Sequence, residues 1–134
     1  MILGIREENK YPSEKRVVLI PEHVEQLIKK GYTVLVQSSN KRIYPDEEYE
    51  KVGAKIVNTL EKADIIIGIK EIPEDEIYPN KIYLFFSHTI KGQKHNMPML
   101  RELIKQKATL LDHERIVDDF GKRLIFFGKF AGNA

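Results

Sequence analysis

Three short apolar segments of the chain are each followed directly by residues that can carry or exchange a proton. The segments span residues 65–69, 82–86 and 108–111. The polar residues after them are Lys70 and Glu71, then Ser87 and His88, then Asp112, His113 and Glu114. An amine, an imidazole and carboxylates can perform acid/base catalysis near neutral pH. Histidine titrates in that range, and burial or a neighbouring charge shifts the pKa of a lysine.

These residues also have structural interpretations. A lysine and a glutamate at a strand end can form an exposed pair in a solvated loop, and His88 can satisfy its position by bonding to the backbone. His23 is predicted in the first turn of a helix, and His95 and His113 in turns, where surface roles are expected. No two histidines have the spacing of metal ligands on a helix, so no metal site is predicted.

Arg16 is a further candidate because it ends a polar stretch and adjoins the apolar residues Val17, Val18 and Leu19. Its guanidinium could bind a carboxylate through two parallel hydrogen bonds. The alternative is a surface arginine whose aliphatic stem lies along the protein. The sequence alone leaves both interpretations open.

The elements that would position these residues alternate between strands and helices. Strands are predicted at residues 1–5, 33–37, 54–57, 65–69, 82–86, 108–111 and 121–127. One helix should begin with Pro21 and end at Gly31, a second should be capped by Asp46 and end at Gly53, and a third, capped by Asn96, should cover 96–107. A further helical turn is predicted at 59–63. The central strands are continuously apolar, which is typical of strands buried on both faces.

This alternation predicts a Rossmann-like, doubly wound α/β domain with a mainly parallel sheet flanked by helices. In such a sheet, ligands bind beyond the carboxyl ends of the strands. We therefore expect the proton-carrying residues to meet at one edge of the sheet. A chain of 134 residues fits a single domain.

Composition excludes several classes of protein. The chain has no cysteine, which rules out disulfides, thiolate metal sites and a cysteine nucleophile, and is consistent with a cytoplasmic location. Its longest apolar runs are about five residues, far below the 18 or so of a membrane span. The net charge of +2 is too small to predict nucleic-acid binding. The basic groups at Lys41 and Arg42, and at Lys91 and Lys94, lack interleaved aromatic residues and are expected to be solvated.

Several longer stretches resemble a known family. They read GIRxE and EKRVVLIPEHV, then NKRIYPDEEYEKVGA, ADIIIGIKEIP, FFSHTIKGQKHNMPML and GKRLIFFGKFAG. Together they resemble the substrate domain of the saccharopine dehydrogenase family, above all the lysine–ketoglutarate reductase half of the bifunctional lysine-degrading enzyme. Alanine dehydrogenase and the amino-terminal domain of transhydrogenase are more distant relatives. The resemblance covers essentially the whole chain, and the FFSHT-IKxQ-xNMPxL stretch is its most specific part.

The resemblance implies a reaction and the residues that perform it. Lys70 in the IKE motif matches the acid/base lysine of the family, Glu71 beside it tunes the charge, and His88 in FSHT matches a second acid/base group. The implied reaction joins lysine and 2-oxoglutarate through an imine, which hydride from NAD(P)H reduces to saccharopine, or runs in reverse.

The resemblance also implies binding residues and a missing cofactor domain. Arg16 in EKRVVL matches an arginine that holds a substrate carboxylate, and Lys91, Glu114 and Arg123 match further polar positions of the site. In the family a Rossmann domain follows, with glycines that approach the cofactor pyrophosphate. This sequence contains no G-x-G-x-x-G. NAD or NADP would therefore be bound mainly by a domain absent from this chain.

We thus predict that residues 1–134 form the amino-terminal substrate-binding domain of an NAD(P)-dependent oxidoreductase, inactive without a nucleotide-binding domain or subunit. The alternative is a stand-alone amino-acid-binding or regulatory module derived from the same family. A glycine-rich strand–turn–helix in the same or a neighbouring reading frame would favour the first. A response-regulator receiver agrees less well, since it requires a lysine where this chain has Asp112. Cofactor choice, reaction direction and oligomeric state stay open.

Overall fold

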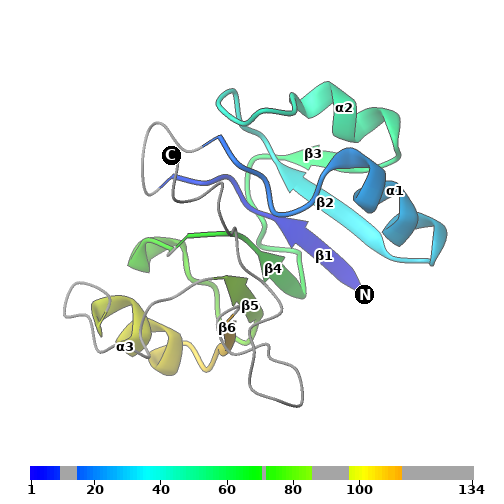
Figure 1. The fold of residues 1–134 in the computed structure, drawn as a ribbon. Helices are drawn as coiled ribbons and strands as arrows, with labels where there is room; N and C mark the ends of the chain where they lie inside the picture. Colours follow the sequence, from blue (N-terminus) through cyan, green and yellow to red (C-terminus); the bar gives the residue numbers. More distant parts are fainter. Residues whose placement is uncertain (10–14, 71, 86–96, 113–134) are drawn as a thin grey trace, which may run out of the picture.

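Residues 1–9, 15–70, 72–85 and 97–112 are described by the computed structural model, which has a central parallel sheet (Figure 1). The strands are β1 (Ile2–Ile5), β2 (Thr33–Gln37), β3 (Lys55–Val57), β4 (Ile65–Ile67), β5 (Ile82–Phe85) and β6 (Thr109–Asp112). They lie in the order β3-β2-β1-β4-β5-β6, and every neighbouring pair is parallel. This is the strand order of a Rossmann fold. The chain places β2 and β3 on one side of β1 and then β4, β5 and β6 on the other side, so the order of the strands reverses between β1 and β4. The predicted α/β fold class is confirmed.

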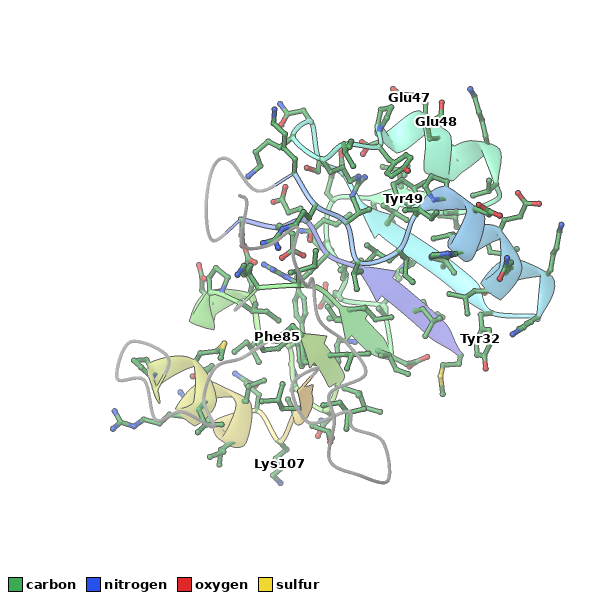
Figure 2. The ribbon with its side chains drawn as sticks, viewed as in Figure 1. Tyr32, Glu47, Glu48, Tyr49, Phe85 and Lys107 are labelled. Carbon is green, nitrogen blue, oxygen red and sulfur yellow. The ribbon has the colours of Figure 1, made fainter. Side chains whose placement is uncertain are left out.

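Helices cover opposite faces of the two halves of the sheet. The helices are α1 (Pro21–Lys29), α2 (Asp46–Lys51) and α3 (Met97–Lys105), with a short 3-10 helix, η1 (Glu74–Glu76). Val24 of α1 and Tyr49 of α2 pack in one buried cluster with Val34 and Val36 of β2. The intervening Leu35 points to the other face, into the cluster that includes residues of α3, β4 and β5. Figure 2 shows Tyr49 beneath α2 and Phe85 on the side of α3.

The ends of α1 and α2 follow backbone rules, with one exception. Pro21 is the first residue of α1, as predicted, and Gly31 and Gly53 have the positive φ angles (100° and 102°) that a glycine adopts after a helix. The prediction that Asp46 caps α2 is wrong, because Pro45 is the cap residue and Asp46 is the first helical residue. The Asp46 carboxylate is bound to the preceding loop instead.

Two further predictions need correction. Residues 59–63 do not form a helical turn; only 61–62 form a turn, and it is not helical. β4 ends at Ile67, two residues before its predicted end. The backbone N–H groups of Ile69 and Lys70 leave the strand ladder because they donate to the carboxylate of Glu8.

Some predicted elements lie outside the described residues, namely the Asn96 cap and the strand at 121–127. None of the helices within the described ranges combines the length and apolar character needed to cross a bilayer.

Candidate functional site

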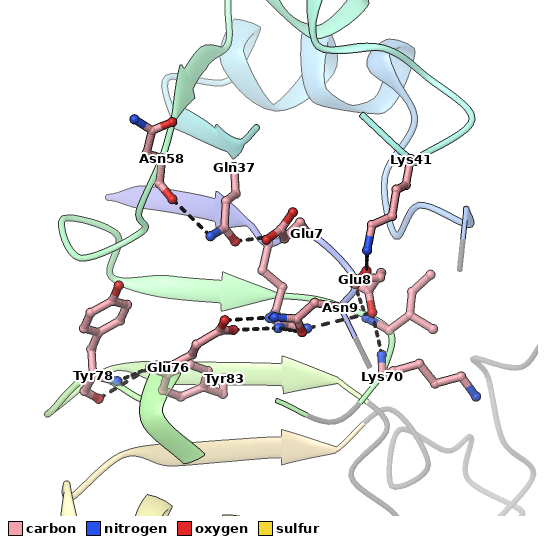
Figure 3. A network of polar contacts seen from close by, with 12 residues as sticks. Glu7, Glu8, Asn9, Gln37, Lys41, Asn58, Lys70, Glu76, Tyr78 and Tyr83 are labelled. Atoms are coloured by element: carbon pink, nitrogen blue, oxygen red, sulfur yellow. Dashed lines mark hydrogen bonds and ion pairs between the residues drawn. The ribbon is translucent and has the colours of Figure 1, made fainter. Parts of the chain in front are cut away.

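The carboxyl ends of β1 and β4 form the point at which the strand order reverses. Ile5 at the end of β1 lies opposite Ile67 at the end of β4. The segments that leave these strands, residues 6–9 and 68–70, therefore begin side by side. Their side chains and backbone form a polar network with Glu76 of η1, which we call the switch-point network (Figure 3).

Glu8 connects the two segments. Its side chain is buried, and its Oε2 accepts a hydrogen bond from the N–H of Ile69 at 3.1 Å, while Oε1 accepts one from the N–H of Lys70 at 2.8 Å. Bonds of this kind, from backbone N–H groups to a carboxylate, are about twice as strong as neutral ones. They compensate a buried charge that would otherwise be very unfavourable. The backbone at Lys70 is thus attached to the end of β1.

Arg6 lies beside Glu8 and is also buried, with 4% of its surface exposed. Its backbone N–H donates to the carbonyl of Ile67 at 3.1 Å, which extends the β1–β4 ladder by one bond. Its Nη2 donates to Asn9 Oδ1 at 2.7 Å and to Glu76 Oε2 at 3.1 Å. Its Nη1 lies 3.9 Å from Glu8 Oε1 and has no hydrogen-bond acceptor among the described residues.

Gly68 makes room for this arrangement. A Cβ atom at position 68 would lie 2.9 Å from both Cγ and Cδ of Arg6 and 3.2 Å from Oε2 of Glu8. Contacts below 3.0 Å essentially do not occur for real Cβ atoms, so a side chain at position 68 would displace the aliphatic stem of Arg6. The absence of a side chain at Gly68 therefore allows Arg6 and Glu8 to be buried together.

A cavity of about 240 Å³ adjoins the network on the α3 side of the sheet. Its polar wall includes Arg6, Gln37, Asn58 and Glu76, and Tyr83 is among the buried residues that line it. This volume is slightly below the range of roughly 300–1,000 Å³ of typical ligand pockets. Gln37 is held in place there, since its Oε1 accepts from the N–H of Glu7 and its Nε2 donates to the carbonyl of Asn58, at 3.0 and 3.1 Å.

Lys70 and Arg16 are the predicted site residues that the structure describes. Lys70 is partly buried, and Figure 3 shows its side chain extending away from the switch-point network. Arg16 lies at the same edge of the sheet and lines, with Glu7, Glu8 and other residues, a cavity of about 10 Å³. That space has room for about one water molecule at most, so this cavity cannot itself hold a substrate.

The remaining predicted residues, Glu71, His88, Lys91, Glu114 and Arg123, lie outside the described residues. The strand before His88 is described: β5 ends at Phe85 and is the parallel neighbour of β4, with Ile67 opposite Leu84. The strands that lead to Lys70 and to His88 therefore end at the same edge of the sheet.

Arg42 was expected to be solvated, and this prediction is wrong. Its side chain is 6% exposed and forms an ion pair with Asp46. Its Nε and Nη1 donate to the carbonyls of Tyr44 and Gln37 at 3.1 and 3.0 Å, and the guanidinium lies 4.8 Å from the centre of the Tyr49 ring. The residue joins the end of β2 to the start of α2, which is a structural role.

Asp46 has a pKa below its ordinary value. Burial alone would raise the pKa of this carboxyl, but three favourable contacts outweigh burial. Ser38 Oγ and the N–H of Ser39 donate to the carboxylate at 2.7 and 3.1 Å, and the positive charge of Arg42 adjoins it. These donors favour the carboxylate form, and they bind both of its oxygens from the preceding loop, so the Asp46 side chain does not cap its own helix.

Sequence reasoning missed the switch-point network. Arg6 and Glu8 belong to the GIRxE motif, but nothing in their local sequence shows that two charged residues are buried. The available signal was their place directly after the first strand, where a Rossmann fold brings ligands. Among the described residues, no group of three or more histidines, aspartates and glutamates is arranged to hold a metal ion.

Comparison with known proteins shows a family match over almost the whole chain. The family described as alanine dehydrogenase/PNT, N-terminal domain, matches residues 4–134. The mitochondrial alpha-aminoadipic semialdehyde synthase of Bos taurus is 42% identical over 133 residues, which are 99% of this chain and 14% of that protein. A Neurospora crassa saccharopine dehydrogenase (NAD(+), L-lysine-forming) is 38% identical over 138 residues, 99% of this chain and 37% of that protein. The chain thus spans only a minor part of each of these relatives.

Solved structures agree with the fold. An L-alanine dehydrogenase superposes with a TM-score of 0.78 at 21% identity, covering 91% of this chain and 35% of that one. A transhydrogenase from Sinorhizobium meliloti superposes with a TM-score of 0.71, also at 21% identity, covering 84% of this chain and 35% of that one. At such identities the likeness shows a shared fold.

Proposed function

The chain belongs to the alanine dehydrogenase/PNT N-terminal domain family, and from this we propose that it is the substrate-binding domain of an oxidoreductase that interconverts saccharopine with lysine and 2-oxoglutarate. Identities of 42% and 38%, to a semialdehyde synthase and a lysine-forming saccharopine dehydrogenase, support this substrate class. The alanine dehydrogenase structure, at 21% identity, supports the fold only.

The position of Lys70 carries the proposal. It follows β4 at the reversal of the strand order, where α/β sheets bind ligands, and its backbone is held by Glu8. We propose that Lys70 and His88 transfer protons while the imine forms and is hydrolysed, and that Glu71 adjusts the charge beside Lys70. We further propose that Arg16, Lys91, Glu114 and Arg123 bind the polar groups of the substrate, with carboxylates paired to the cationic side chains.

The residues after β1 do not fit a nicotinamide dinucleotide. In a dinucleotide site with this strand order, glycines follow β1 so that the backbone can approach the pyrophosphate. Here the positions are Arg6, Glu7 and Glu8; Arg6 and Glu8 are buried against partners, and the carboxylates would repel phosphate groups. We therefore propose that NAD or NADP, which supplies or accepts the hydride, is held mainly by another domain or subunit.

We propose that the chain acts in the cytoplasm, although the name of the bovine relative assigns that protein to mitochondria. The partners that we propose are lysine, 2-oxoglutarate, saccharopine and the nucleotide-binding domain or subunit. The lack of a dinucleotide fit also favours a second candidate function, an amino-acid-binding or regulatory module without redox chemistry. The two candidates differ in whether an added nucleotide-binding partner restores hydride transfer.

Ligand-dependent melting tests the substrate class. Saccharopine, or lysine with 2-oxoglutarate, should raise the melting temperature of the chain by several degrees, because a ligand at 100 times its Kd adds about 2.7 kcal/mol to the stability of the folded state. Arg16→Met should reduce the shift, and Lys30→Met, a change on the exposed end of α1, should not. Alanine with pyruvate is the matched comparison. A larger shift with that pair, or none with any ligand, would contradict a saccharopine site in this chain.

A further inference from the structure

The contact between Glu8 and the segment before Lys70 has a geometry suited to positioning. Both carboxylate oxygens are used, and they bind two consecutive backbone N–H groups, at 3.1 Å for Ile69 and 2.8 Å for Lys70. Two bonds to adjacent peptide groups restrict both the distance and the orientation of that backbone. The Cα–Cβ bond of Lys70, and hence the start of its side chain, acquires a defined direction relative to β1.

The surroundings of Glu8 keep its carboxylate in place. The Arg6 guanidinium, 3.9 Å away, is itself held by Asn9 and Glu76 at 2.7 and 3.1 Å. Lys41 Nζ donates to the backbone carbonyl of Glu8 at 3.2 Å, so the main chain of Glu8 is restrained too. The close packing of Gly68 against both side chains leaves little space for movement.

A structural contact alone would not require a charge at this position. Burying a carboxylate and a guanidinium is costly, and replacement of such pairs by apolar residues is often neutral or stabilising. A small apolar residue in place of Glu8 would remove the buried charge, but it would leave the N–H groups of Ile69 and Lys70 without this acceptor. A carboxylate differs because it can accept two backbone hydrogen bonds at once, and here both come from the segment that carries Lys70.

We propose that Glu8 is a positioning residue for Lys70: it sets the backbone from which the lysine side chain reaches the substrate edge of the sheet. The inference rests on the proposed acid/base role of Lys70, but the positioning itself can be measured without any turnover. Glu8 acts on Lys70 through the backbone and is not itself in contact with substrate. Loss of the Glu8 carboxylate should change the environment of the Lys70 amine more than it changes the affinity of the chain for substrate carboxylates. We assign the binding of those carboxylates to other residues.

Nuclear magnetic resonance of the chain, labelled with ¹⁵N and ¹³C, tests the positioning. In the wild type, a scalar coupling across the hydrogen bond should join the Lys70 amide nitrogen to the Glu8 carboxyl carbon. Glu8→Gln should accelerate hydrogen exchange of the Ile69 and Lys70 amides at least tenfold and shift the Lys70 ¹³Cε resonance. Glu8→Asp retains the charge but is one methylene shorter, so it should produce the same changes in smaller measure.

Glu76→Gln is the matched control, because Glu76 also forms an ion pair with Arg6 and makes no described bond to residues 69–70. It should lower the melting temperature as Glu8→Gln does while leaving the Lys70 ¹³Cε resonance in place. Equal effects of the two variants on that resonance, or absence of the coupling in the wild type, would overturn the inference. The coupling needs no variant, so the test stands even if Glu8→Gln does not fold.

Saccharopine titration of the same samples separates this inference from the proposed function. Wild-type chain that shows the coupling but binds no saccharopine contradicts the proposed substrate and leaves Glu8 as the residue that orients Lys70. If the wild-type chain binds saccharopine and the ligand-induced change at Lys70 ¹³Cε is the same in Glu8→Gln, the positioning role alone is contradicted. We expect saccharopine to perturb Lys70 ¹³Cε in the wild type and at least twofold less in Glu8→Gln.

Discussion

Tyr49 links α2 to the segment before α1 through its hydroxyl group. The side chain is fully buried, and its O–H donates to the backbone carbonyl of Leu19 at 2.7 Å. Burial raises the pKa of Tyr49 to about 12, since the phenolate would lose its hydration. Because the folded-state value is above the ordinary value of about 10, the neutral phenol stabilises the fold below pH 10 and this contribution is lost as the pH rises towards 12.

The effect of Tyr49→Phe on stability should therefore depend on pH. At pH 7 the variant should be less stable by about 0.5–1.5 kcal/mol, because the Leu19 carbonyl loses its donor. Between pH 10 and 12 it should lose less stability than the wild type. Urea denaturation at several pH values measures both, with Tyr32→Phe, at an exposed ring, as the control. Part of the alkaline loss should remain, since burial also raises the pKa of Tyr83 to about 12.

Site residues differed in how far the sequence revealed them. Lys70 could be located because it follows a continuous apolar run, whose end marks the edge of a parallel sheet. The roles of Arg6 and Glu8 could not be predicted, because charged residues are buried only with partners, and here Glu76 and the backbone of Lys70 are 70 and 62 residues away in the chain. Such pairings form only when the segment after β1 meets the end of β4 and η1 in the folded chain.

At the scale of elements, β1 is tightly packed at Gly4. A Cβ atom there would lie 2.8 Å from the Cβ of Ala63 and 3.1 Å from a methyl group of Leu60. Both neighbours are buried in the cluster on the α3 side. The loop before β4 thus approaches the backbone of β1 directly.

Gly4→Ala should destabilise the domain by about 1–3 kcal/mol, the usual effect of overpacking, although alanine is normally better tolerated than glycine within a strand. The double variant Gly4→Ala/Ala63→Gly should recover part of the loss, because it removes the nearest atom. Urea denaturation of the wild type, both single variants and the double variant forms a complete cycle. Additive effects in that cycle would show that the two positions do not contact each other.

The elements themselves were largely predictable, and the errors have local causes. Short, mainly apolar runs identified the strands, and Pro21, Gly31 and Gly53 marked helix ends through backbone geometry. β4 is shorter than predicted because the N–H groups of Ile69 and Lys70 donate to the Glu8 carboxylate. The prediction that Asp46 caps α2 was wrong because the Asp46 carboxylate binds Ser38, Ser39 and Arg42 instead.

For the whole molecule, the main prediction concerns hydride transfer. The purified chain should not oxidise NADH or NADPH in the presence of lysine and 2-oxoglutarate, because the segment after β1 carries Arg6 and Glu8 in place of phosphate-binding glycines. Nicotinamide absorbance measures this, with a complete lysine-forming saccharopine dehydrogenase as the positive control. Turnover by the chain alone would show that it binds the cofactor by another route.

The close packing of Arg6 against Gly68 limits how this sequence can diverge. A side chain at position 68 and a long one at position 6 exclude each other, because the Arg6 stem occupies the space in which a Cβ would lie. A lineage can enlarge residue 68 only after it has shortened residue 6. Relatives should therefore carry either arginine at position 6 with glycine at position 68, or a smaller residue at position 6 with a larger one at position 68. Two sites far apart in the gene would then evolve as a pair.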